Sequence, residues 1–522
     1  MHVLRIAAVR GTAAIAAANT YFQPDEYWQS LEIAHRIVFG YGYRTWEWAR
    51  EPPIRSVIHP LLFVPVYLFA NVTPGGAQAV LIVLHTASFY LLFTSSRTFS
   101  NTAEAALVSI ALYFWPLTDR GVPRRRFLVA LAAAYTAVLV RPTSIVLWAF
   151  LGVWHLADMS KRGALPVLKA ITDAVLVGAV VLGVGLVADS LYYGRLVFTP
   201  ATFFIENVVH SVAIFYGTHP WHWYLSQGLP AMLTVATPWV LAGWWNALIG
   251  RISARDPGAV QRLAYTALFV VAVFSLLSHK EFRFLQSVLP MLHVCGAIYL
   301  ASAAPSVTNW SAASRSLPNP LRTLLLAQVP FLIYTLAFHS RGQVAIMGHL
   351  HDLASQERVH SIGFMMPCHS TPWQSHLHLP KFASEEPTNS GRLWFVGCPP
   401  PQPNDGPMYW DQSDFFYHDP ITYIYDRFPH QVDPAFPPSP GEVKKAARVP
   451  PERAQFDLGW QHEWPSHLVV FDALLHVKAH NTSVKDILAE KGYTERLRVW
   501  NSIFHPDQRR RGSIVVLRHS AA

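Results

Sequence analysis

The sequence has few charged residues for its length. Only 14% of its 522 residues are Asp, Glu, Lys or Arg, whereas 52% are hydrophobic. Three long stretches contain no charged residue at all: 56–96, 229–250 and 284–314. Uncharged apolar runs of roughly 18 or more residues are typical of transmembrane helices. The low charge therefore argues against a water-soluble chain and predicts an α-helical polytopic membrane protein.

Cysteine is also scarce, and several familiar motifs are missing. The chain has three cysteines, Cys295, Cys368 and Cys398, and no CxxC pair. It also lacks a P-loop, a GxGxxG turn, a nucleophile elbow and internal repeats. Cys295 lies in an apolar run, so we expect it to pack there. Cys368 and Cys398 could pair in an oxidising lumen, and the sequence leaves that open.

The formal net charge of +9 does not indicate nucleic-acid binding. Much of the excess lies in short loops between apolar segments, where Lys and Arg set membrane orientation. We expect four basic loops on the cytoplasmic side: Arg120 with Arg124–Arg126; Lys161, Arg162 and Lys169; Arg251, Arg255 and Arg262; Arg315 and Arg322. The lumenal side then holds loops 20–58, 190–228 and 279–283 and everything after Arg341.

About eleven spans are expected, with uncertain ends. We place them roughly at 4–20, 59–73, 77–95, 102–118, 127–141, 142–158, 171–189, 229–249, 263–278, 284–303 and 321–338. Internal prolines predict kinks or breaks at Pro65, Pro116, Pro142, Pro290 and Pro330. The first segment also resembles a signal peptide, but we favour an uncleaved span because it would hold the following loop at the membrane.

That first loop, 20–58, contains two adjacent carboxylates, Asp25 and Glu26, among many aromatic residues. Carboxylates at a membrane boundary cost solvation energy unless water or a cation reaches them. Tyr and Trp, such as Trp28, favour the membrane interface. The loop indicates either a polar reaction chamber or an ordinary interfacial aromatic belt with solvated acids.

The loop at 190–228 is rich in aromatic and histidine side chains, among them His219, Trp221 and His222. Ring stacking and histidine hydrogen bonds suit a sugar or a phosphate headgroup. The alternatives are an interfacial aromatic loop and a metal site, although no carboxylate or cysteine completes a metal set at a recognisable spacing.

A charged segment, Ser278 to Phe284 (SHKEFRF), separates two apolar spans. Lys280 and Arg283 are suited to bind a phosphate, and Glu281 to orient one of them or accept a sugar hydroxyl. The alternative is a self-paired interfacial turn. Arg141, before Pro142, is either a second cationic contact or a charge that caps a helical hairpin.

The chain changes character near residue 340. We expect residues 1–340 to form a transmembrane catalytic domain and residues 341–522 a small lumenal α/β domain. Short apolar runs predict strands at 393–397, 467–471 and 513–517, and a helix is expected near 483–491. Asn481 begins an Asn-Thr-Ser glycosylation sequon in that domain.

Several of these motifs together resemble the dolichol-phosphate-mannose-dependent mannosyltransferases of the endoplasmic reticulum. The motifs are TYFQPDEYWQSLEIAHRIVFGYGYRTWEW with IRSVIHP, then FYGTHPWHWYLSQGLP, then SHKEFRFLQSVLP. The first loop and the segment MMPCHSTPWQSHLH (365–378) are most similar to the member that adds the third mannose of the glycosylphosphatidylinositol (GPI) core.

The resemblance implies a C-type glycosyltransferase of the ER membrane with a lumenal active site. It implies inverting transfer from dolichyl phosphate mannose to the 2-hydroxyl of a two-mannose GPI precursor. Asp25 would be the base, supported by Glu26, and His279, Lys280 and Arg283 would bind the donor phosphate. Trp28, His59, His219, Trp221, His222 and Glu281 would contact substrate. Because lipid phosphate already activates the donor, we expect no metal or other cofactor.

The expected partners are therefore ER membrane lipids and the two lipid substrates, with no nucleic acid and no obligate protein partner. Three alternatives remain open. One is a mannosyltransferase of N-glycan precursor assembly, which differs in its acceptor lipid. The others are a lipid or solute transporter, although no inverted repeat is evident, and a non-catalytic assembly subunit.

Overall fold

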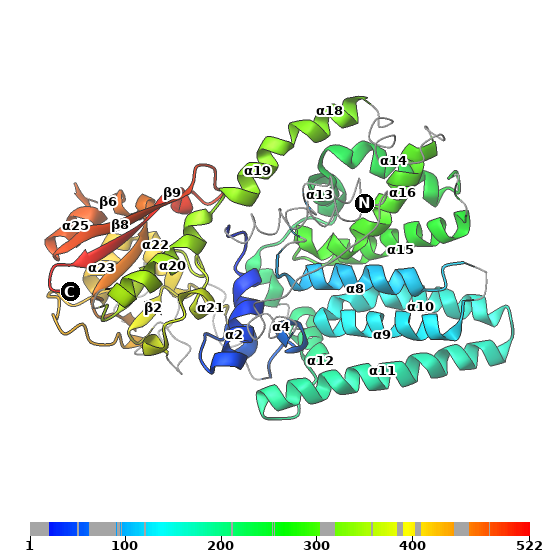
Figure 1. Ribbon diagram of the computed structural model, residues 1–522, viewed down its shortest axis with the longest axis horizontal. Helices are drawn as coiled ribbons and strands as arrows, with labels where there is room; N and C mark the ends of the chain where they lie inside the picture. Colours follow the sequence, from blue (N-terminus) through cyan, green and yellow to red (C-terminus); the bar gives the residue numbers. More distant parts are fainter. Residues whose placement is uncertain are drawn as a thin grey trace. The chain divides into compact units, whose positions relative to one another are not determined.

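Figure 1 shows the chain as a computed structural model. The structure describes residues 20–49, 52–61, 90, 94, 97–118, 122–209, 212–252, 254, 256–302, 319–356, 359–383, 390–401, 409–442, 459–479 and 481–522. Contacts divide the chain into two compact units. Unit 1 comprises Met1–Ile15, Arg50–Leu62 and Phe69–Leu332, and unit 2 comprises Ala16–Ala49, Phe63–Leu68 and Ile333–Ala522.

The division by contacts differs from the linear division expected near residue 340. Much of the first loop joins unit 2, because its aromatic side chains enter a core there. Tyr21, Tyr27 and Trp28 pack in one cluster with residues of the C-terminal region. The loop residues from Arg50 to Leu62 belong to unit 1 instead.

Unit 1 is built from helices, most of which match a predicted apolar span. The long ones are α8 (Ser100–Phe114), α9 (Arg124–Val140), α10 (Ile145–Ser160), α11 (Ala164–Tyr193), α14 (Thr237–Leu248), α15 (Pro257–Leu276) and α16 (Leu289–Ser302). Shorter helices are α4 (Ile58–Leu61), α12 (Thr199–Phe204), α13 (Leu229–Leu233) and α18 (Asn319–Ala327), while α19 (Val329–Ala337) runs across the boundary into unit 2.

Four helices in the described part of the chain are long and apolar enough to cross a membrane: Ala164–Tyr193, Pro257–Leu276, Phe282–Leu300 and Asn319–Gln356. A multi-pass membrane protein is thus supported, and the total of about eleven spans stays a prediction. The predicted spans at 4–20, 59–73 and 77–95 fall largely outside the described residues.

Helix breaks occur near the prolines that predicted them. Between α9 and α10, Arg141 is extended with φ −144°, and Pro142 starts a short 3₁₀ turn. Proline cannot donate the helical N–H and disfavours a helical residue before it. Pro116 follows the end of α8, Pro290 lies at the start of α16, and Pro330 at the start of α19. Pro65 lies outside the described residues.

Helices α14 and α16 approach each other closely at two glycines. A Cβ added at Gly243 would lie 2.5 Å from the Cys295 carbonyl oxygen, and one at Gly296 would lie 2.8 Å from Val240. Small residues let helix backbones approach within a membrane. Cys295 is buried in this contact as a free thiol, which agrees with the packing role expected for it.

Unit 2 contains a five-stranded mixed sheet in the order β2-β1-β5-β9-β8. Its strands are β1 (Ile362–Met365), β2 (Leu393–Phe395), β5 (His467–Phe471), β8 (Tyr493–Ser502) and β9 (Gly512–His519). β1 pairs in parallel with β2 and β5, and β9 pairs antiparallel with β5 and β8. The three predicted strands are thus confirmed as β2, β5 and β9.

Alternate residues of these strands enter two separate cores. Phe364, Val469 and Val516 face one cluster, whereas Met365, Leu468 and Val515 face the other. Because successive side chains of a strand point to opposite faces, a sheet buried on both faces reads as a continuous apolar run. That is why polar and apolar residues do not alternate along these strands in the sequence.

Helices cover both faces of the sheet. α20 (Arg341–Gln356) packs in the first cluster, and α23 (Pro420–Arg427) and α25 (Val484–Glu490) pack in the second. The remaining elements are α2 (Glu32–Phe39), α3 (Trp46–Ala49), α21 (Gln374–Leu377), α22 (Gln412–His418), α24 (Asp472–Leu475) and the short strands β3 (Gly441–Glu442), β4 (Trp460–Gln461), β6 (Lys478–Ala479) and β7 (Thr482–Ser483). The predicted helix near 483–491 is confirmed as α25, which a Ser483–Asp486 capping box begins.

Candidate active site

The charged SHKEFRF segment follows α15 and runs into a 3₁₀ turn, Phe282–Val288, before α16. The side chains of its Glu281 and Arg283 form a two-point ion pair. Arg283 Nη2 donates to Glu281 Oε1 at 2.8 Å, and Arg283 Nε lies 2.7 Å from Glu281 Oε2. Both partners are mostly buried, with 16% and 25% of their side chains exposed. A paired guanidinium and carboxylate fix each other in this geometry.

His279 joins the same pair from the other side. Its Nε2 lies 3.3 Å from Glu281 Oε1, and its Nδ1 donates to the Gly217 carbonyl at 2.9 Å. Burial alone lowers the pKa of His279, but the hydrogen bonds to Glu281 and Gly217 raise it overall. Burial raises the pKa of Glu281, yet Arg283 and His279 outweigh it and hold that pKa well below its usual range. Glu281 is therefore a carboxylate that contacts both Arg283 and His279.

Lys280 points into the structure. It is 2% exposed, and its ammonium donates to the carbonyl oxygen of His219 at 2.9 Å and to that of Leu277. The His219 N–H in turn donates to the Ser278 carbonyl at 3.0 Å. Lys280 thus fastens the histidine-rich loop onto the SHKEFRF segment. An ammonium has three donors, so one N–H remains beyond these two carbonyls.

The neighbouring loop, around residues 219–226, is rich in aromatic side chains. His219 stacks on Trp223 with ring centroids 4.5 Å apart, and Trp223 lies 4.8 Å from Phe282. Trp221 is 68% exposed and meets His222 edge-on at 5.7 Å. His222 Nδ1 contacts the Ser226 hydroxyl at 3.1 Å. Trp221 therefore offers an open ring face, which is the kind that sugars stack on.

A buried arginine lies beneath the charged segment. Arg141 is 7% exposed, and its Nη1 donates to Ser100 Oγ at 3.1 Å and to Asn101 Oδ1 at 3.2 Å. Its Nε lies 3.5 Å from Glu104 Oε2. Asn101 also donates to the Arg283 carbonyl at 3.0 Å. Arg141 is therefore part of a polar network that ties α8 to the SHKEFRF segment.

The IRSVIHP motif is held in place by a carboxylate on α11. Asp189 accepts hydrogen bonds from Ser56 Oγ at 2.9 Å, the Val57 N–H at 2.8 Å and Thr199 Oγ1 at 2.7 Å. This anchors the chain next to His59, which is 5% exposed in α4. Arg55 and Arg141 act electrostatically on His59. His59 therefore lies within electrostatic reach of two arginines of unit 1. Its contact with substrate stays a prediction.

In unit 2 the two predicted catalytic acids differ in their surroundings. Glu26 is 3% exposed and accepts the Phe22 N–H at 2.8 Å. This bond closes the turn at the start of the loop. Asp25 is half-buried and acts electrostatically on Tyr21 and His369. Of the two, Asp25 is the more exposed.

Trp28 lies in a core. It is 2% exposed, and its indole N–H donates to the Thr371 carbonyl at 3.1 Å. Its ring stacks with Trp373 at 5.8 Å and lies 4.4 Å from the His369 ring. Glu32, fully buried, accepts from the N–H groups of Tyr43 and Ser375 at 2.9 and 2.8 Å. The first loop and the segment 365–378 thus form one packed structure, and Trp28 supports it.

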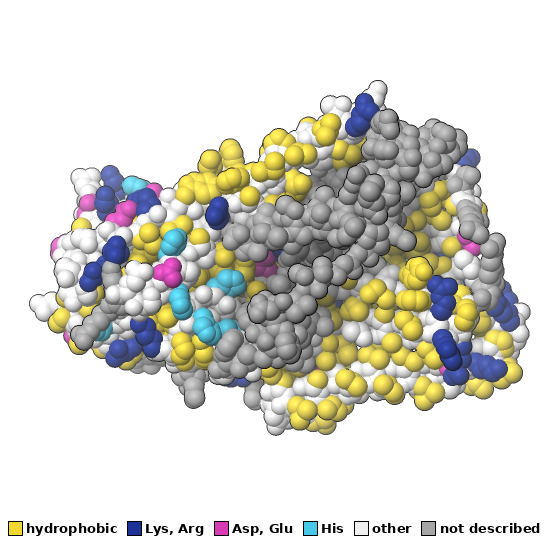
Figure 2. All heavy atoms as spheres, viewed as in Figure 1, with side chains coloured by type: hydrophobic (Ala, Val, Ile, Leu, Met, Phe, Trp, Pro, Cys, Tyr) yellow, Lys and Arg dark blue, Asp and Glu magenta, His cyan; other side chains and the backbone are white. Residues whose placement is uncertain are grey.

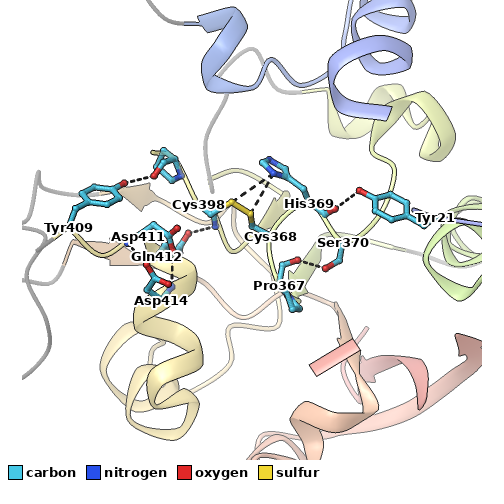
Figure 3. Close-up of a disulfide and its surroundings, with 12 residues drawn as sticks. Tyr21, Pro367, Cys368, His369, Ser370, Cys398, Tyr409, Asp411, Gln412 and Asp414 are labelled. Carbon is cyan, nitrogen blue, oxygen red and sulfur yellow. Dashed lines mark hydrogen bonds between the residues drawn. A yellow bond between two sulfur atoms is a disulfide. The ribbon is translucent and has the colours of Figure 1, made fainter. Parts of the chain in front are cut away.

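A disulfide joins Cys368 to Cys398 beside this core, with Cα atoms 6.0 Å apart. Figure 3 shows His369 next to both sulfur atoms, with its carbonyl accepting from the Tyr21 hydroxyl. In the described part of the chain, these three residues form the group of potential metal ligands. The thiolate form of cysteine binds metals, and a disulfide leaves neither cysteine as a thiolate. The bridge is therefore a structural crosslink next to the first loop.

Asn481 sits in a tight turn between β6 and β7. It is exposed and has a positive φ of 70°, a conformation that Asn tolerates better than most residues. The sequon is accessible, and its glycosylation stays a prediction.

Several buried polar residues were not identified from the sequence, among them Glu32, Glu104 and Asp189. Glu104 and Asp189 lie in predicted spans, where an ionisable residue is expensive unless it has partners. Their position in apolar stretches was the signal that could have identified them. Glu32 had no such signal, because two of its partners are the backbone N–H groups of Gln374 and Ser375, which are distant in the chain.

Comparisons with known proteins identify the family. A sequence profile described as the Alg9-like mannosyltransferase family matches residues 2–84 and 75–378. GPI mannosyltransferase 3 of Yarrowia lipolytica is 33% identical over 553 residues, covering 98% of this chain and 96% of that protein. GPI alpha-1,2-mannosyltransferase 3 of Danio rerio is 31% identical, covering 93% of this chain and 84% of that protein.

Among solved structures, ArnT of Cupriavidus metallidurans is similar in its apo state, with a TM-score of 0.51 and 13% identity, covering 98% of this chain and 97% of that one. The same enzyme bound to undecaprenyl phosphate covers 80% and 88%, also with a TM-score of 0.51. The family match and the helical architecture thus define a membrane-embedded glycosyltransferase, and its fold is similar to that of ArnT. The chain belongs to the Alg9-like mannosyltransferase family.

Proposed function

We propose that the chain transfers the third mannose of the GPI core, in an α-1,2 linkage, from dolichyl phosphate mannose to a two-mannose GPI precursor. The observation that carries this proposal is the similarity to GPI mannosyltransferase 3 of Yarrowia lipolytica, at 33% identity across nearly the full length of both chains. The reaction inverts the anomeric centre and takes place on the lumenal side of the ER membrane.

Inversion in one step needs a base that removes the acceptor proton as the lipid phosphate leaves. Asp25 is this base, because it is the more exposed of the adjacent pair. Glu26 supports it by closing the turn through the Phe22 N–H. The acidic loop belongs to unit 2 and the SHKEFRF segment to unit 1.

The leaving phosphate needs positive charge in a fixed position. Arg283 and His279 supply it, and Glu281 holds both in place. Lys280 contributes its remaining N–H and positions the loop of His219, Trp221 and His222 through the His219 carbonyl. That loop contacts the sugars. No metal is needed, because the lipid phosphate activates the donor and these side chains bind the phosphate released.

The test is to remove the protein from cells and profile lipid intermediates by mass spectrometry. We expect a two-mannose GPI species to accumulate, and wild-type protein but not Asp25→Asn to reverse this. Truncated dolichol-linked oligosaccharide with normal GPI would assign the chain to N-glycan assembly instead. No change in either lipid pool would contradict a mannosyltransferase role and favour a transporter.

A further inference from the structure

The connection between β8 and β9 presents large apolar side chains to the outside of unit 2. Ile503 is 62% exposed, Phe504 is 72% exposed, and Trp500, near the end of β8, is 41% exposed. We call residues 500–511, which include these three side chains, the hairpin tip. Neighbouring apolar side chains on a surface mark a site that contacts lipid or another protein. The proposed reaction makes no use of the tip.

The hairpin tip is fastened to the C-terminal end of α19 and the residues after it, within unit 2. The Tyr334 hydroxyl accepts the N–H groups of Ile503 at 3.2 Å and of Phe504 at 3.1 Å. The Tyr334 ring meets the Phe504 ring edge-on at 6.0 Å, and the rings of His339 and His505 stack at 5.3 Å. These contacts fix the apolar side chains of the tip beside the end of α19 (Figure 1).

The helix that holds the tip is a candidate membrane span. The run Asn319–Gln356 is long and apolar enough to cross a bilayer, and its apolar part ends at Phe338, before the polar residues 339–341. Ile333 and Phe338 are exposed, and Figure 2 shows hydrophobic side chains gathered along α19. The Phe338 ring meets the Trp500 ring at 6.5 Å. Because tryptophan favours the depth at which a span leaves the membrane, the tip lies where an interfacial side chain is expected.

Hydrogen bonds within the hairpin tip hold its backbone in one shape. The Asn501 side-chain amide donates to the Arg510 carbonyl at 2.8 Å, and Arg511 Nε donates to the His505 carbonyl at 3.0 Å. The Asp507 N–H donates to His505 Nδ1 at 3.0 Å. Backbone groups that approach lipid need partners within the protein. The tip therefore exposes its apolar side chains while several of its backbone groups are already bonded.

The second half of the hairpin tip is cationic. Residues 509–511 are all arginine. Arg509 Nε lies 2.9 Å from Asp507 Oδ1, and Arg510 Nε lies 3.3 Å from Asp507 Oδ2, so these two arginines pair with the carboxylate of the tip. Arg511 is exposed. Apolar side chains next to cations are typical of a segment that lies in a membrane interface, where the cations meet lipid headgroups.

We propose that the hairpin tip anchors unit 2 to the membrane. Trp500, Ile503 and Phe504 enter the interfacial lipid beside the end of the span, and Arg511 contacts lipid phosphates. The occupant of this surface is lipid rather than a protein partner, because Tyr334 holds the tip at the end of a helix that is apolar enough to cross the bilayer.

The test measures how deeply the tip lies in lipid, with the full chain reconstituted in phosphatidylcholine nanodiscs. A nitroxide label is attached at Phe504→Cys, and its collision rates with oxygen, which concentrates in lipid, and with a water-soluble nickel chelate are compared. The matched control is Tyr425→Cys, because Tyr425 is also an exposed aromatic residue of unit 2 but lies on α23, which packs on the other face of the sheet from α20. The wild-type chain, whose thiol at Cys295 is buried, measures background labelling.

We expect the ratio of oxygen to nickel collisions to be several-fold higher at Phe504→Cys than at Tyr425→Cys. Equal ratios at the two positions would overturn the proposal. Spectral broadening at Phe504→Cys that disappears on dilution with unlabelled chain would overturn it as well, because a second copy of the chain would then cover the tip.

A photoactivatable phosphatidylcholine, with the reactive group at the start of its acyl chain, provides a second measurement on unmodified protein. Trypsin cuts after Arg498 and Arg509 and so releases the apolar half of the tip as one peptide, 499–509. We expect lipid adducts on this peptide. Adducts confined to other parts of the chain would contradict the anchor, whatever the effect of the label at Phe504→Cys on folding.

Discussion

The acidic loop in unit 2 and the SHKEFRF segment in unit 1 use their side chains in different ways. In the acidic loop, Trp28 and Glu26 are buried and hold the backbone, which leaves Asp25 as the more available charge. In the SHKEFRF segment, the charged groups bind one another, and Glu281 gathers Arg283 and His279. One motif uses buried side chains to hold its backbone, whereas the other gathers charged side chains around one carboxylate.

The largest expected effect tests which of the two adjacent acids, Asp25 or Glu26, is the base. Asp25→Asn removes the proposed base without changing the size of the side chain, so turnover should fall roughly 10²–10⁴-fold. Glu26→Gln should cost much less, because the amide oxygen still accepts the Phe22 N–H. Mannose transfer from dolichyl phosphate mannose, measured with purified protein, compares the two. A greater loss in Glu26→Gln would move the base to Glu26.

Substitutions of Trp28 and Trp221 distinguish a tryptophan that packs in a core from one that contacts substrate. Trp28→Ala should destabilise unit 2 by about 3–5 kcal/mol, the usual cost of emptying a buried aromatic site. Trp221→Ala, at an indole that is 68% exposed, should change stability by less than about 0.5 kcal/mol and lower activity instead. Thermal unfolding in detergent and transfer assays on both variants check this. Normal stability in Trp28→Ala would return Trp28 to the set of substrate contacts.

Much of this arrangement could be predicted from the sequence. The long helices, three of the five strands of the sheet and the breaks at Pro142, Pro290 and Pro330 follow from apolar runs and proline chemistry. The residue types at the charged segment were also identified. What could not be predicted is which side chains face a partner within the protein, because that depends on contacts between distant segments.

Trp28 and Lys280 illustrate that limit. An interfacial tryptophan and a core tryptophan have the same sequence signal, and contacts with distant residues such as Thr371 and Trp373 distinguish them. A lysine beside a phosphate and a lysine that binds backbone carbonyls also have the same signal, yet Lys280 is 2% exposed. The division into units shows the same effect, because the first loop joins the distant segment 365–378 through its aromatic rings.

The next largest expected effect concerns Lys280, whose ammonium positions the histidine-rich loop. Lys280→Met leaves the carbonyls of His219 and Leu277 without their donor, which should cost about 1–3 kcal/mol of stability. Because the histidine-rich loop loses its attachment, KM for the donor should rise as well. Lys280→Gln keeps one N–H and should recover part of both losses. If stability is unchanged in Lys280→Met while KM for the donor rises, then Lys280 acts on the phosphate directly and has no positioning role.

The smallest effect is a pH dependence within the SHKEFRF segment. The folded pKa of His279 lies above its ordinary value, because Glu281 and the Gly217 carbonyl favour the protonated ring despite burial. The stability that this provides is fully present below about pH 6.5, the unfolded pKa, and is lost as pH rises through the folded pKa. Glu281 has a lowered pKa and stays ionised throughout that range. The difference in stability between wild type and His279→Gln, measured by thermal unfolding from pH 6 upward, should therefore shrink with rising pH; a difference that stayed constant would mean that the cationic surface consists of Arg283 and Lys280 alone.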